Sequence, residues 1–398
     1  MNILVLNCGS SSLKYQLIDM ADESVKAKGL VDRIGLDDAL LNHTPEGKEK
    51  VVLHAEIPNH TVAIKMVLGA LSNQEYGVIK DLSEINAVGH RTVHGGSKFH
   101  SAVKIDEDVI HKIKELYILA PLHNPPSIAG IKACIEEMPN VPMVCVFDTA
   151  FHQTMPAKAY TYGVPFDMYE KYDVRRFGFH GTSHRYVSER AVALMGRPAE
   201  DLKIITCHLG NGSSIAAVNG GKCIDTSMGF TPLEGVLMGT RTGSIDAAIV
   251  PFLMEQENWT VQDVNNFLNK KCGFLGISGV SSDLRYVEDA AANGNEQAQL
   301  SIDVFYYGIL KFIGAYTAAM NGVDAIAFTA GIGENSIDAR AEILSQLGYL
   351  GVELDKEANQ CRGEERCITT ANSKVKAFII PTNEELVIAR DTAMVVQG

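Results

Sequence analysis

The run Ile3-Leu4-Val5-Leu6-Asn7-Cys8-Gly9-Ser10-Ser11-Ser12 has a counterpart later in the chain, Ile204-Ile205-Thr206-Cys207-His208-Leu209-Gly210-Asn211-Gly212-Ser213-Ser214. Each copy consists of an apolar run, a tight turn of glycine and serine, and a second β-type run, over residues 13–19 and 215–218. This order is typical of a β-hairpin, so the sequence predicts two similar β-hairpins, one in each copy of a duplicated domain. Turn-rich strand ends are common, however, and coincidence explains a single match of this kind equally well.

Short apolar runs alternate with helix-length segments along the rest of the chain. The runs are typical of strands buried on both faces of a sheet and cover residues 3–7, 13–19, 87–91, 143–147, 203–207, 325–329 and 375–380. Helices are predicted at residues 125–138, 245–254, 261–270, 283–292 and 302–316. Thr260 and the pair Ser281-Ser282 are the expected N-caps of the helices that follow them. The alternation predicts the α/β class, with a domain boundary after Asp148.

The composition excludes several classes of partner. The 398 residues carry 35 basic and 48 acidic side chains, a formal charge of −13, and 46% of them are hydrophobic. This length suggests two to three domains with a sizeable core. An acidic chain lacks the basic surface that nucleic acids and anionic membranes attract, so we expect neither partner. No run approaches the roughly 18 apolar residues of a membrane span, and the apolar run at residues 3–6 is too short for a signal peptide.

The eight cysteines are scattered without a CxxC pair, and several lie in apolar runs. This pattern favours buried, reduced thiols over a disulfide framework or a zinc site. Disulfides are rare where glutathione and thioredoxin keep thiols reduced, so we expect a cytoplasmic protein.

Both glycine- and serine-rich turns are candidate phosphate sites. Their small residues allow phosphate oxygens to approach backbone N–H groups, and Lys14 follows the first turn. Neither turn is a P-loop, and neither is followed directly by the helix that a dinucleotide-binding fingerprint requires. The alternative is that each is only a turn.

Two arginines lie in loops of small residues. Arg91 falls within Gly89-His90-Arg91-Thr92-Val93-His94-Gly95-Gly96, and Arg241 falls within Thr240-Arg241-Thr242-Gly243-Ser244. A guanidinium group at a strand end offers a planar fork to a carboxylate or a phosphate, although a surface arginine in a loop is the competing interpretation. The pairs His90/His94 and His180/His184 have the spacing of zinc ligands but lack the glutamate of H-E-x-x-H, so we do not expect them to bind a metal.

Isolated polar residues at strand ends complete the set of candidates. Asp148 and Glu384 follow apolar strands, where α/β sheets place ligand-binding groups, and their hard oxygens suit Mg²⁺ held together with phosphates. Glu384 is equally well explained as a first-turn helix carboxylate. His180 lies in a glycine-flanked polar loop, which favours a functional role. Gly331-Ile332-Gly333-Glu334-Asn335 links a strand to a helix and leaves room for a flat ring against the backbone; an ordinary tight turn is the alternative.

Together these motifs resemble the acetate kinase family. The resemblance rests on Asn7 to Lys14, Gly89 to Gly96, His208 to Gly212, Gly239 to Gly243 and Gly331 to Asn335, in family order over nearly the whole chain. It implies two duplicated actin-like ATPase (ribonuclease H-like) domains with a cleft between them. Residues 1–148, completed by about 385–398, would form the first domain and residues 149–384 the second, and the protein would be a homodimer.

The resemblance also implies roles for individual residues. The catalytic set would be Arg91, Asp148, His180, Asn211 and Arg241, with Asn7, Asp148 and Glu384 around Mg²⁺ or, alternatively, Mn²⁺. ATP or ADP would contact Asn7, Ser10, Ser12, Lys14, His208, Leu209, Gly210, Asn211, Gly212, Asp283, Leu284, Arg285, Gly331, Ile332, Gly333 and Asn335. Arg91 would bind acetate together with an apolar wall of Val93, Leu122, Phe179 and Pro232. Leu284 stands where some relatives have an aromatic residue, which leaves the nucleotide preference open.

The activity implied is a reversible, Mg²⁺-dependent transfer of the ATP γ-phosphoryl group to acetate, giving acetyl phosphate and ADP by direct in-line transfer. A carboxylate is already ionised at neutral pH, so it needs no general base, and the site must instead overcome the repulsion between two anions. Two alternatives remain from the sequence alone: a propionate kinase, and an actin-like switch protein driven by ATP hydrolysis.

Overall fold

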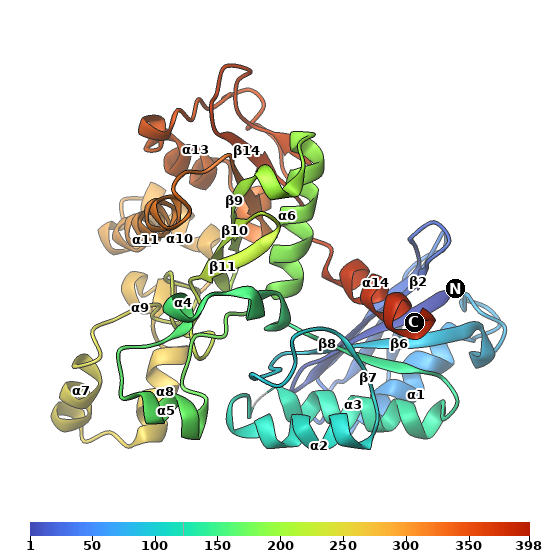
Figure 1. Ribbon diagram of the computed structural model, residues 1–398. Coiled ribbons are helices and arrows are strands. Elements are labelled where there is room, and N and C mark those ends of the chain that lie inside the picture. Colours follow the sequence, from blue (N-terminus) through green and yellow to red (C-terminus); the bar gives the residue numbers. More distant parts are fainter. Residues whose placement is uncertain (122) are drawn as a thin grey trace. The chain divides into compact units, whose positions relative to one another are not determined.

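The computed structural model describes residues 1–121 and 123–398, which form two compact units (Figure 1). The first unit contains Met1–Ala150 together with the C-terminal segment Asn383–Gly398, and the second contains Phe151–Thr382. Each unit is built around one β-sheet with helices against it. The predicted α/β class is therefore confirmed.

The first unit holds an eight-stranded sheet in the order β5-β4-β3-β2-β1-β6-β8-β7. Its strands are β1 (Asn2–Cys8), β2 (Ser12–Asp19), β3 (Ser24–Asp32), β4 (Leu40–Pro45), β5 (Val51–His54), β6 (Ile85–Thr92), β7 (Val103–Lys104) and β8 (Met143–Phe147). Its helices are α1 (His60–Leu71), α2 (Glu107–Glu115), α3 (Asn124–Glu137) and α14 (Glu384–Gln397).

Strand β1 explains why this sheet is covered on both faces. Its side chains alternate between the faces, and nearly all of them are buried. Leu4 and Leu6 pack with residues of α1 and α3, whereas Ile3 and Val5 pack with Ile388 and other residues of α14. Figure 1 shows α14 on one side of the sheet and α1 and α3 on the other. The C-terminal helix therefore completes the core of the N-terminal unit.

The second unit holds a six-stranded sheet in the order β11-β10-β9-β12-β14-β13. Its strands are β9 (Lys203–Leu209), β10 (Ser213–Asn219), β11 (Lys222–Thr226), β12 (Ala325–Thr329), β13 (Arg366–Cys367) and β14 (Lys376–Ile379). Its helices are α4 (Ala157–Tyr160), α5 (Phe166–Tyr172), α6 (Gly181–Met195), α7 (Ile249–Glu257), α8 (Val261–Lys270), α9 (Gly273–Ser278), α10 (Leu284–Ala292), α11 (Glu296–Met320), α12 (Ala330–Asn335) and α13 (Ile337–Ser345).

One strand pattern occurs in both sheets. In each sheet, three neighbouring antiparallel strands end with β1 or β9. The next two strands run parallel to that strand, and a short antiparallel strand forms the edge. The first sheet runs β3-β2-β1-β6-β8-β7, and the second runs β11-β10-β9-β12-β14-β13. The two hairpins expected from the repeated sequence are β1–β2 and β9–β10, at equivalent places in this order. The predicted duplication is confirmed.

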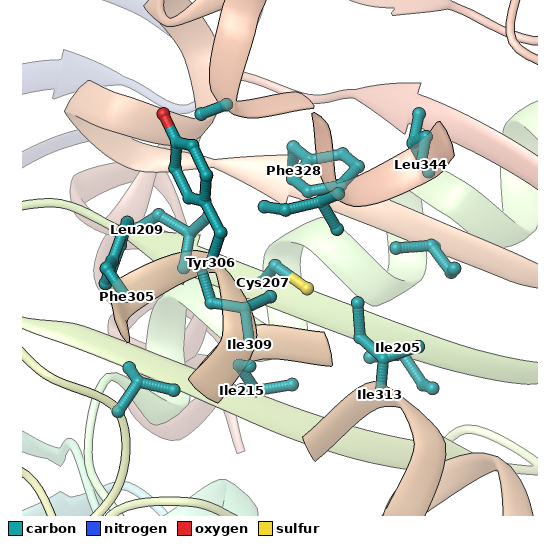
Figure 2. Close-up of a cluster of buried hydrophobic side chains, with 14 of the residues drawn as sticks. Ile205, Cys207, Leu209, Ile215, Phe305, Tyr306, Ile309, Ile313, Phe328 and Leu344 are labelled. Atoms are coloured by element: carbon teal, nitrogen blue, oxygen red, sulfur yellow. The ribbon is translucent and has the colours of Figure 1, made fainter. Parts of the chain in front are cut away.

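The long helix α11 covers one face of the second sheet. Its apolar side chains Phe305, Ile309 and Ile313 pack on Ile205 and Cys207 of β9, as Figure 2 shows. The opposite face carries a smaller cluster in which Val187 and Ala191 of α6 meet Ile204 and Ala327. Strands β9 and β12 are thus buried on both faces, as their continuous apolar sequences predicted.

Two predicted helix starts are wrong. The helix expected from residue 245 begins at Ile249, because the Asp246 carboxylate accepts the N–H of Ala248 at 2.9 Å and holds this stretch in a turn. The helix expected after Ser281-Ser282 begins at Leu284, and its N-cap is Asp283, which accepts the N–H of Arg285 at 3.0 Å. Thr260 does cap α8, in a capping box with Asp263.

Six of the eight cysteines are buried and all eight are free thiols. Among the residues that the structure describes, no helix is both long and apolar enough to cross a membrane.

Gly89 of β6 generates a prediction about stability. A Cβ atom there would lie 2.4 Å from the Thr392 Oγ1 atom and 2.7 Å from a methyl group of Ile388, so α14 packs directly on the glycine. Gly89→Ala should lower the free energy of unfolding by about 1–3 kcal/mol through overpacking. Gly69→Ala is the matched control: it lies in α1 with no neighbour within 4 Å, and it should raise this free energy by about 0.5–1 kcal/mol. Urea denaturation measures both, and an unchanged midpoint for Gly89→Ala would contradict the packing.

Candidate active site

A cluster of charged and polar side chains surrounds Arg91 at the end of β6. Its guanidinium group donates two hydrogen bonds to Asp148, from Nε to Oδ1 at 2.9 Å and from Nη2 to Oδ2 at 2.5 Å. It also donates from Nη1 to Oδ1 of Asn7 at 3.3 Å, and its Nε lies 3.9 Å from Oε2 of Glu384. The ends of β1, β6 and β8 and the first residue of α14 therefore bring Asn7, Arg91, Asp148 and Glu384 together.

The Arg91 cluster carries more negative than positive charge. Burial by itself would lower the pKa of Arg91, but the carboxylates of Asp148 and Glu384 raise it above its ordinary value. The pKa of Glu384 is raised to about 7, chiefly by burial; Arg91 opposes this shift, and the neighbouring charges of Asp148 and Glu385 add to it. A single guanidinium group thus fails to compensate two carboxylates in a poorly hydrated place.

The Arg91 cluster fits a divalent cation. Its free lone pairs belong to carboxylate and amide oxygens, which are hard ligands, and two carboxylates lie beside a single guanidinium group. No group of three or more metal-binding His, Cys, Asp or Glu side chains occurs among the described residues. The two carboxylates and the amide oxygen of the Arg91 cluster suit Mg²⁺, which commonly takes one or two carboxylates and completes its shell with water and substrate phosphates. Glu384 is also the first residue of α14, so its interpretation as a first-turn helix carboxylate holds as well.

The first glycine- and serine-rich turn joins β1 to β2 beside this cluster. The turn is closed by a hydrogen bond from the Gly9 N–H to the Ser12 carbonyl at 2.8 Å, and the Gly9 carbonyl lies 2.7 Å from Nε2 of His60. Ser10 is exposed in the turn, Ser12 begins β2, and Lys14 projects from β2 with its side chain exposed. These polar groups remain candidates for phosphate binding.

His180 lies directly before α6 in the second unit. Its backbone is left-handed, with φ of 56°, which is uncommon for a residue with a side chain and is often found at functional sites. The imidazole Nδ1 lies 2.9 Å from the Ser214 hydroxyl, and the ring stacks on His208 with a centroid distance of 4.0 Å and an angle of 21°. The second glycine- and serine-rich turn, between β9 and β10, thus lies against His180.

Arg241 approaches the same turn. A Cβ atom on Gly212 would lie 3.5 Å from Nε2 of His180 and 3.7 Å from Nη1 of Arg241, so the glycine leaves space next to both side chains. Asn211 packs against Gly239, whose N–H donates to the Asn211 carbonyl at 3.1 Å. The structure therefore brings together His180, Asn211, Gly212 and Arg241.

The charge of Arg241 is not balanced by a carboxylate. The guanidinium group donates from Nη1 to the Pro232 carbonyl at 3.2 Å and contacts the sulfur of Met238, and within the described residues it has no acidic partner within 4.0 Å. Burial lowers its pKa, yet an arginine side chain stays protonated. A partly buried cation that has no acidic partner among the described residues, beside an imidazole and a glycine, is suited in charge to an anion.

A cavity of about 870 Å³ opens next to this group of residues. This volume lies within the range of cofactor and ligand pockets. Eight of the residues predicted to bind the nucleotide line it: Gly210, Asn211, Asp283, Leu284, Arg285, Gly331, Ile332 and Asn335. Leu284 is buried and supplies an apolar patch, while Arg285 forms an ion pair with Asp283 at 2.5 Å. The cavity thus offers an apolar wall, backbone glycines and charged groups.

The other residues predicted to bind the nucleotide lie around this cavity or in the first unit. His208 and Leu209 are buried in β9, and Gly333 is a buried residue of α12 that packs against Phe328 and Cys207. Asn7, Ser10, Ser12 and Lys14 belong to the β1–β2 hairpin, as described above.

The residues predicted to surround the acetate methyl group are divided between the two units. Val93 follows β6 in the first unit, whereas Phe179 and Pro232 belong to the second. Leu122 lies outside the described residues.

Six residues that the sequence did not indicate also line the cavity: Glu288, Ser336, Ile337, Asp338, Gln360 and Arg362. Glu288 lies four positions after Leu284 on α10, so the helical repeat places it on the same face. Ser336 donates a hydrogen bond to Oε1 of Glu288 at 3.2 Å. Gln360 and Arg362 come from an irregular loop, and no motif marks them.

The chain is similar to known proteins over its whole length. Residues 2–390 match the model of the acetokinase family. An acetate kinase of Acetivibrio thermocellus is 58% identical over 398 residues, with 100% of both chains covered. The crystal structure of Porphyromonas gingivalis acetate kinase superposes with a TM-score of 0.95 at 48% identity, covering 99% of each chain. That of a propionate kinase from Francisella tularensis superposes with a TM-score of 0.92 at 42% identity, also covering 99% of each chain. This chain therefore belongs to the acetokinase family.

Proposed function

We propose that this protein is an acetate kinase, which transfers the γ-phosphoryl group of ATP to acetate and also catalyses the reverse reaction. Family membership gives the reaction class. The observation that carries the proposal is the uncompensated charge of Arg241 beside His180 and Gly212, next to the 870 Å³ cavity. These residues offer cationic and polar donors to a phosphoryl group, and the cavity offers room for a nucleoside.

The residue types suit a carboxylate nucleophile. Acetate is ionised at neutral pH, so no side chain has to remove a proton from it. The carboxylates near the site are accordingly free for other roles: Asp148 orients Arg91 through two hydrogen bonds, which fixes the guanidinium fork for an anionic substrate. Arg241, His180 and Asn211 would then bind the phosphoryl group as its charge spreads over three oxygens.

Asn7, Asp148 and Glu384 would hold Mg²⁺, with Mn²⁺ as the alternative ion. When bound, the cation would neutralise charge on the phosphates and act as a Lewis acid. The excess negative charge of the Arg91 cluster supports this part of the proposal.

We also propose that two copies associate. Helix α7 has apolar residues but no buried one, and Ile249 and Phe252 are 40% and 59% exposed. An exposed apolar helix of this kind is typical of an interface between proteins, which supports a homodimer. The six buried thiols and the use of ATP support a cytoplasmic location.

Trapping the product with hydroxylamine tests the proposed activity. With ATP and Mg²⁺, we expect acyl hydroxamate from acetate, less from propionate and least from butyrate. Greater kcat/KM for propionate than for acetate would replace the proposal with a propionate kinase, in line with the related Francisella structure. ATP turnover without carboxylate and without acyl phosphate would favour the ATP-driven switch instead.

The role of Arg241 leads to a prediction about rate. Arg241→Ala should lower kcat by on the order of 10²-fold or more, because it removes a preorganised donor to the charge of the transition state. Arg366→Ala is the matched control, since this exposed arginine pairs only with Glu364 at the surface, at 2.8 Å. Its kcat should stay within about twofold of the wild type. A near-normal kcat for folded Arg241→Ala would refute the assigned role.

The raised pKa of Glu384 leads to a prediction about pH. In the metal-free protein the folded state holds this proton up to about pH 7, whereas the unfolded chain releases it near the ordinary pKa of 4.5. The folded state therefore binds more protons in this window, and stability falls as the pH rises from about 4.5 to about 7. Glu384→Gln should remove this contribution, so its unfolding free energy should depend less steeply on pH in that window. Urea denaturation measures the unfolding free energy of wild type and Glu384→Gln at each pH. An equally steep dependence on pH in both proteins would contradict the raised pKa of Glu384.

Val93 provides a prediction about substrate size. If Val93 lines the pocket for the acetate methyl group, Val93→Ala should raise the propionate-to-acetate ratio of kcat/KM, because one methylene in such a pocket is worth about 1–3 kcal/mol. Val25→Ala is the control and should leave this ratio unchanged, since this partly buried valine packs on the face of the first sheet that α14 covers. An unchanged ratio in Val93→Ala would show that Val93 does not contact the substrate.

A further inference from the structure

A chain of hydrogen bonds links Thr382, the last residue of the second unit, to His208, whose ring stacks on that of His180. The Thr382 hydroxyl donates to the Ser183 hydroxyl at 2.9 Å, and the Ser183 oxygen lies 2.8 Å from Nδ1 of His208. The His208 ring in turn stacks on His180 at 4.0 Å. Ser183 is fully buried and His208 is 9% exposed, so water competes little for these bonds.

The direction of these bonds determines where His208 carries its proton. The Ser183 oxygen accepts a hydrogen bond from the Thr382 hydroxyl, which leaves the Ser183 O–H available to donate to Nδ1 of His208. A ring nitrogen that accepts a hydrogen bond carries no proton. With Ser183 as the donor, the ring N–H of His208 is on Nε2.

Thr382 is itself held by the helix that borders the nucleotide cavity. Its N–H donates to Oε1 of Glu334 at 3.2 Å. The same oxygen accepts the Ala330 N–H at 2.8 Å and the Thr329 hydroxyl at 3.3 Å, at the start of α12. Gly331, Ile332 and Asn335 of α12 line the cavity. Glu334 and Thr382 thus connect the wall of the cavity to the imidazole pair.

We propose that Ser183 and Thr382 are positioning residues: they fix His208 as the Nε2–H tautomer and hold its ring as a platform for His180. This inference rests on the proposed function, in which His180 binds the phosphoryl group. A platform that keeps one tautomer and one ring plane removes alternative orientations of His180 before the substrate binds. Neither Ser183 nor Thr382 has to contact the substrate.

Thr382→Val tests the inference because valine keeps the branched shape and removes the hydroxyl donor. Thr382→Ser is the matched variant that keeps the donor, and Ser183→Ala removes the next link. Long-range ¹H–¹⁵N spectra of the unliganded, histidine-labelled protein report the tautomer without any need for activity. We expect Nε2–H for His208 in wild type and Thr382→Ser, and mixed tautomers in Thr382→Val and Ser183→Ala.

Steady-state kinetics give the second readout. Thr382→Val and Ser183→Ala should lower kcat by on the order of 10-fold, the scale of a lost outer-shell hydrogen bond, while the KM for acetate changes less than twofold. Thr382→Ser should restore kcat. An unchanged His208 spectrum in both Thr382→Val and Ser183→Ala would overturn the inference, and so would an equal loss of kcat in Thr382→Ser and Thr382→Val, which would indicate packing.

The two proposals fail in different ways. If the wild type forms no acyl phosphate, the proposed function and the kinetic role of the two hydroxyl groups are both wrong, whereas the spectra still decide whether they fix the tautomer. If the wild type is active and the tautomer does not respond, only the present inference is wrong.

Discussion

Charge compensation around two arginines is the constraint on which the candidate site depends. Arg91 has two carboxylates within reach, Asp148 and Glu384, and burial raises the pKa of Glu384 to about 7 although Arg91 lowers it. Arg241 has no acidic partner among the described residues, and burial lowers its pKa. We propose that one cluster binds a cation and the other an anion, which is the pair of properties that a metal-dependent phosphoryl transfer requires.

The fold explains how these groups arise in an acidic protein. The net charge of −13 describes the exterior, whereas binding depends on a few groups at strand ends. In the first unit, β6 and β8 are parallel neighbours, so Arg91 and Asp148 emerge at the same edge of the sheet. The returning helix α14 adds Glu384 there and packs directly on Gly89. In the second unit, the β9–β10 turn keeps Gly212 next to both His180 and Arg241.

Much of this arrangement could be predicted from the sequence, because local patterns specify it. The apolar runs identified the central strands, and the repeated Gly-Ser-Ser turn identified the duplicated hairpins. The wrong helix start at residue 245 came from the side chain of Asp246, which favours a turn over the helix. The hydrogen bond between Ser183 and Thr382 escaped prediction because the two residues lie 199 positions apart in the sequence. Gln360 and Arg362 come from an irregular loop without any motif.

The central claim is that the carboxylate of the substrate itself attacks the γ-phosphorus of ATP. Acetate labelled with ¹⁸O in both oxygens, incubated with the protein, ATP and Mg²⁺, tests it by ³¹P NMR of the product. Direct attack keeps one labelled oxygen between carbon and phosphorus, so we predict acetyl phosphate whose phosphorus signal carries the shift of one ¹⁸O. Label in AMP would instead indicate attack at the α-phosphorus, and unlabelled inorganic phosphate as the product would indicate attack by water. Either result would contradict the account.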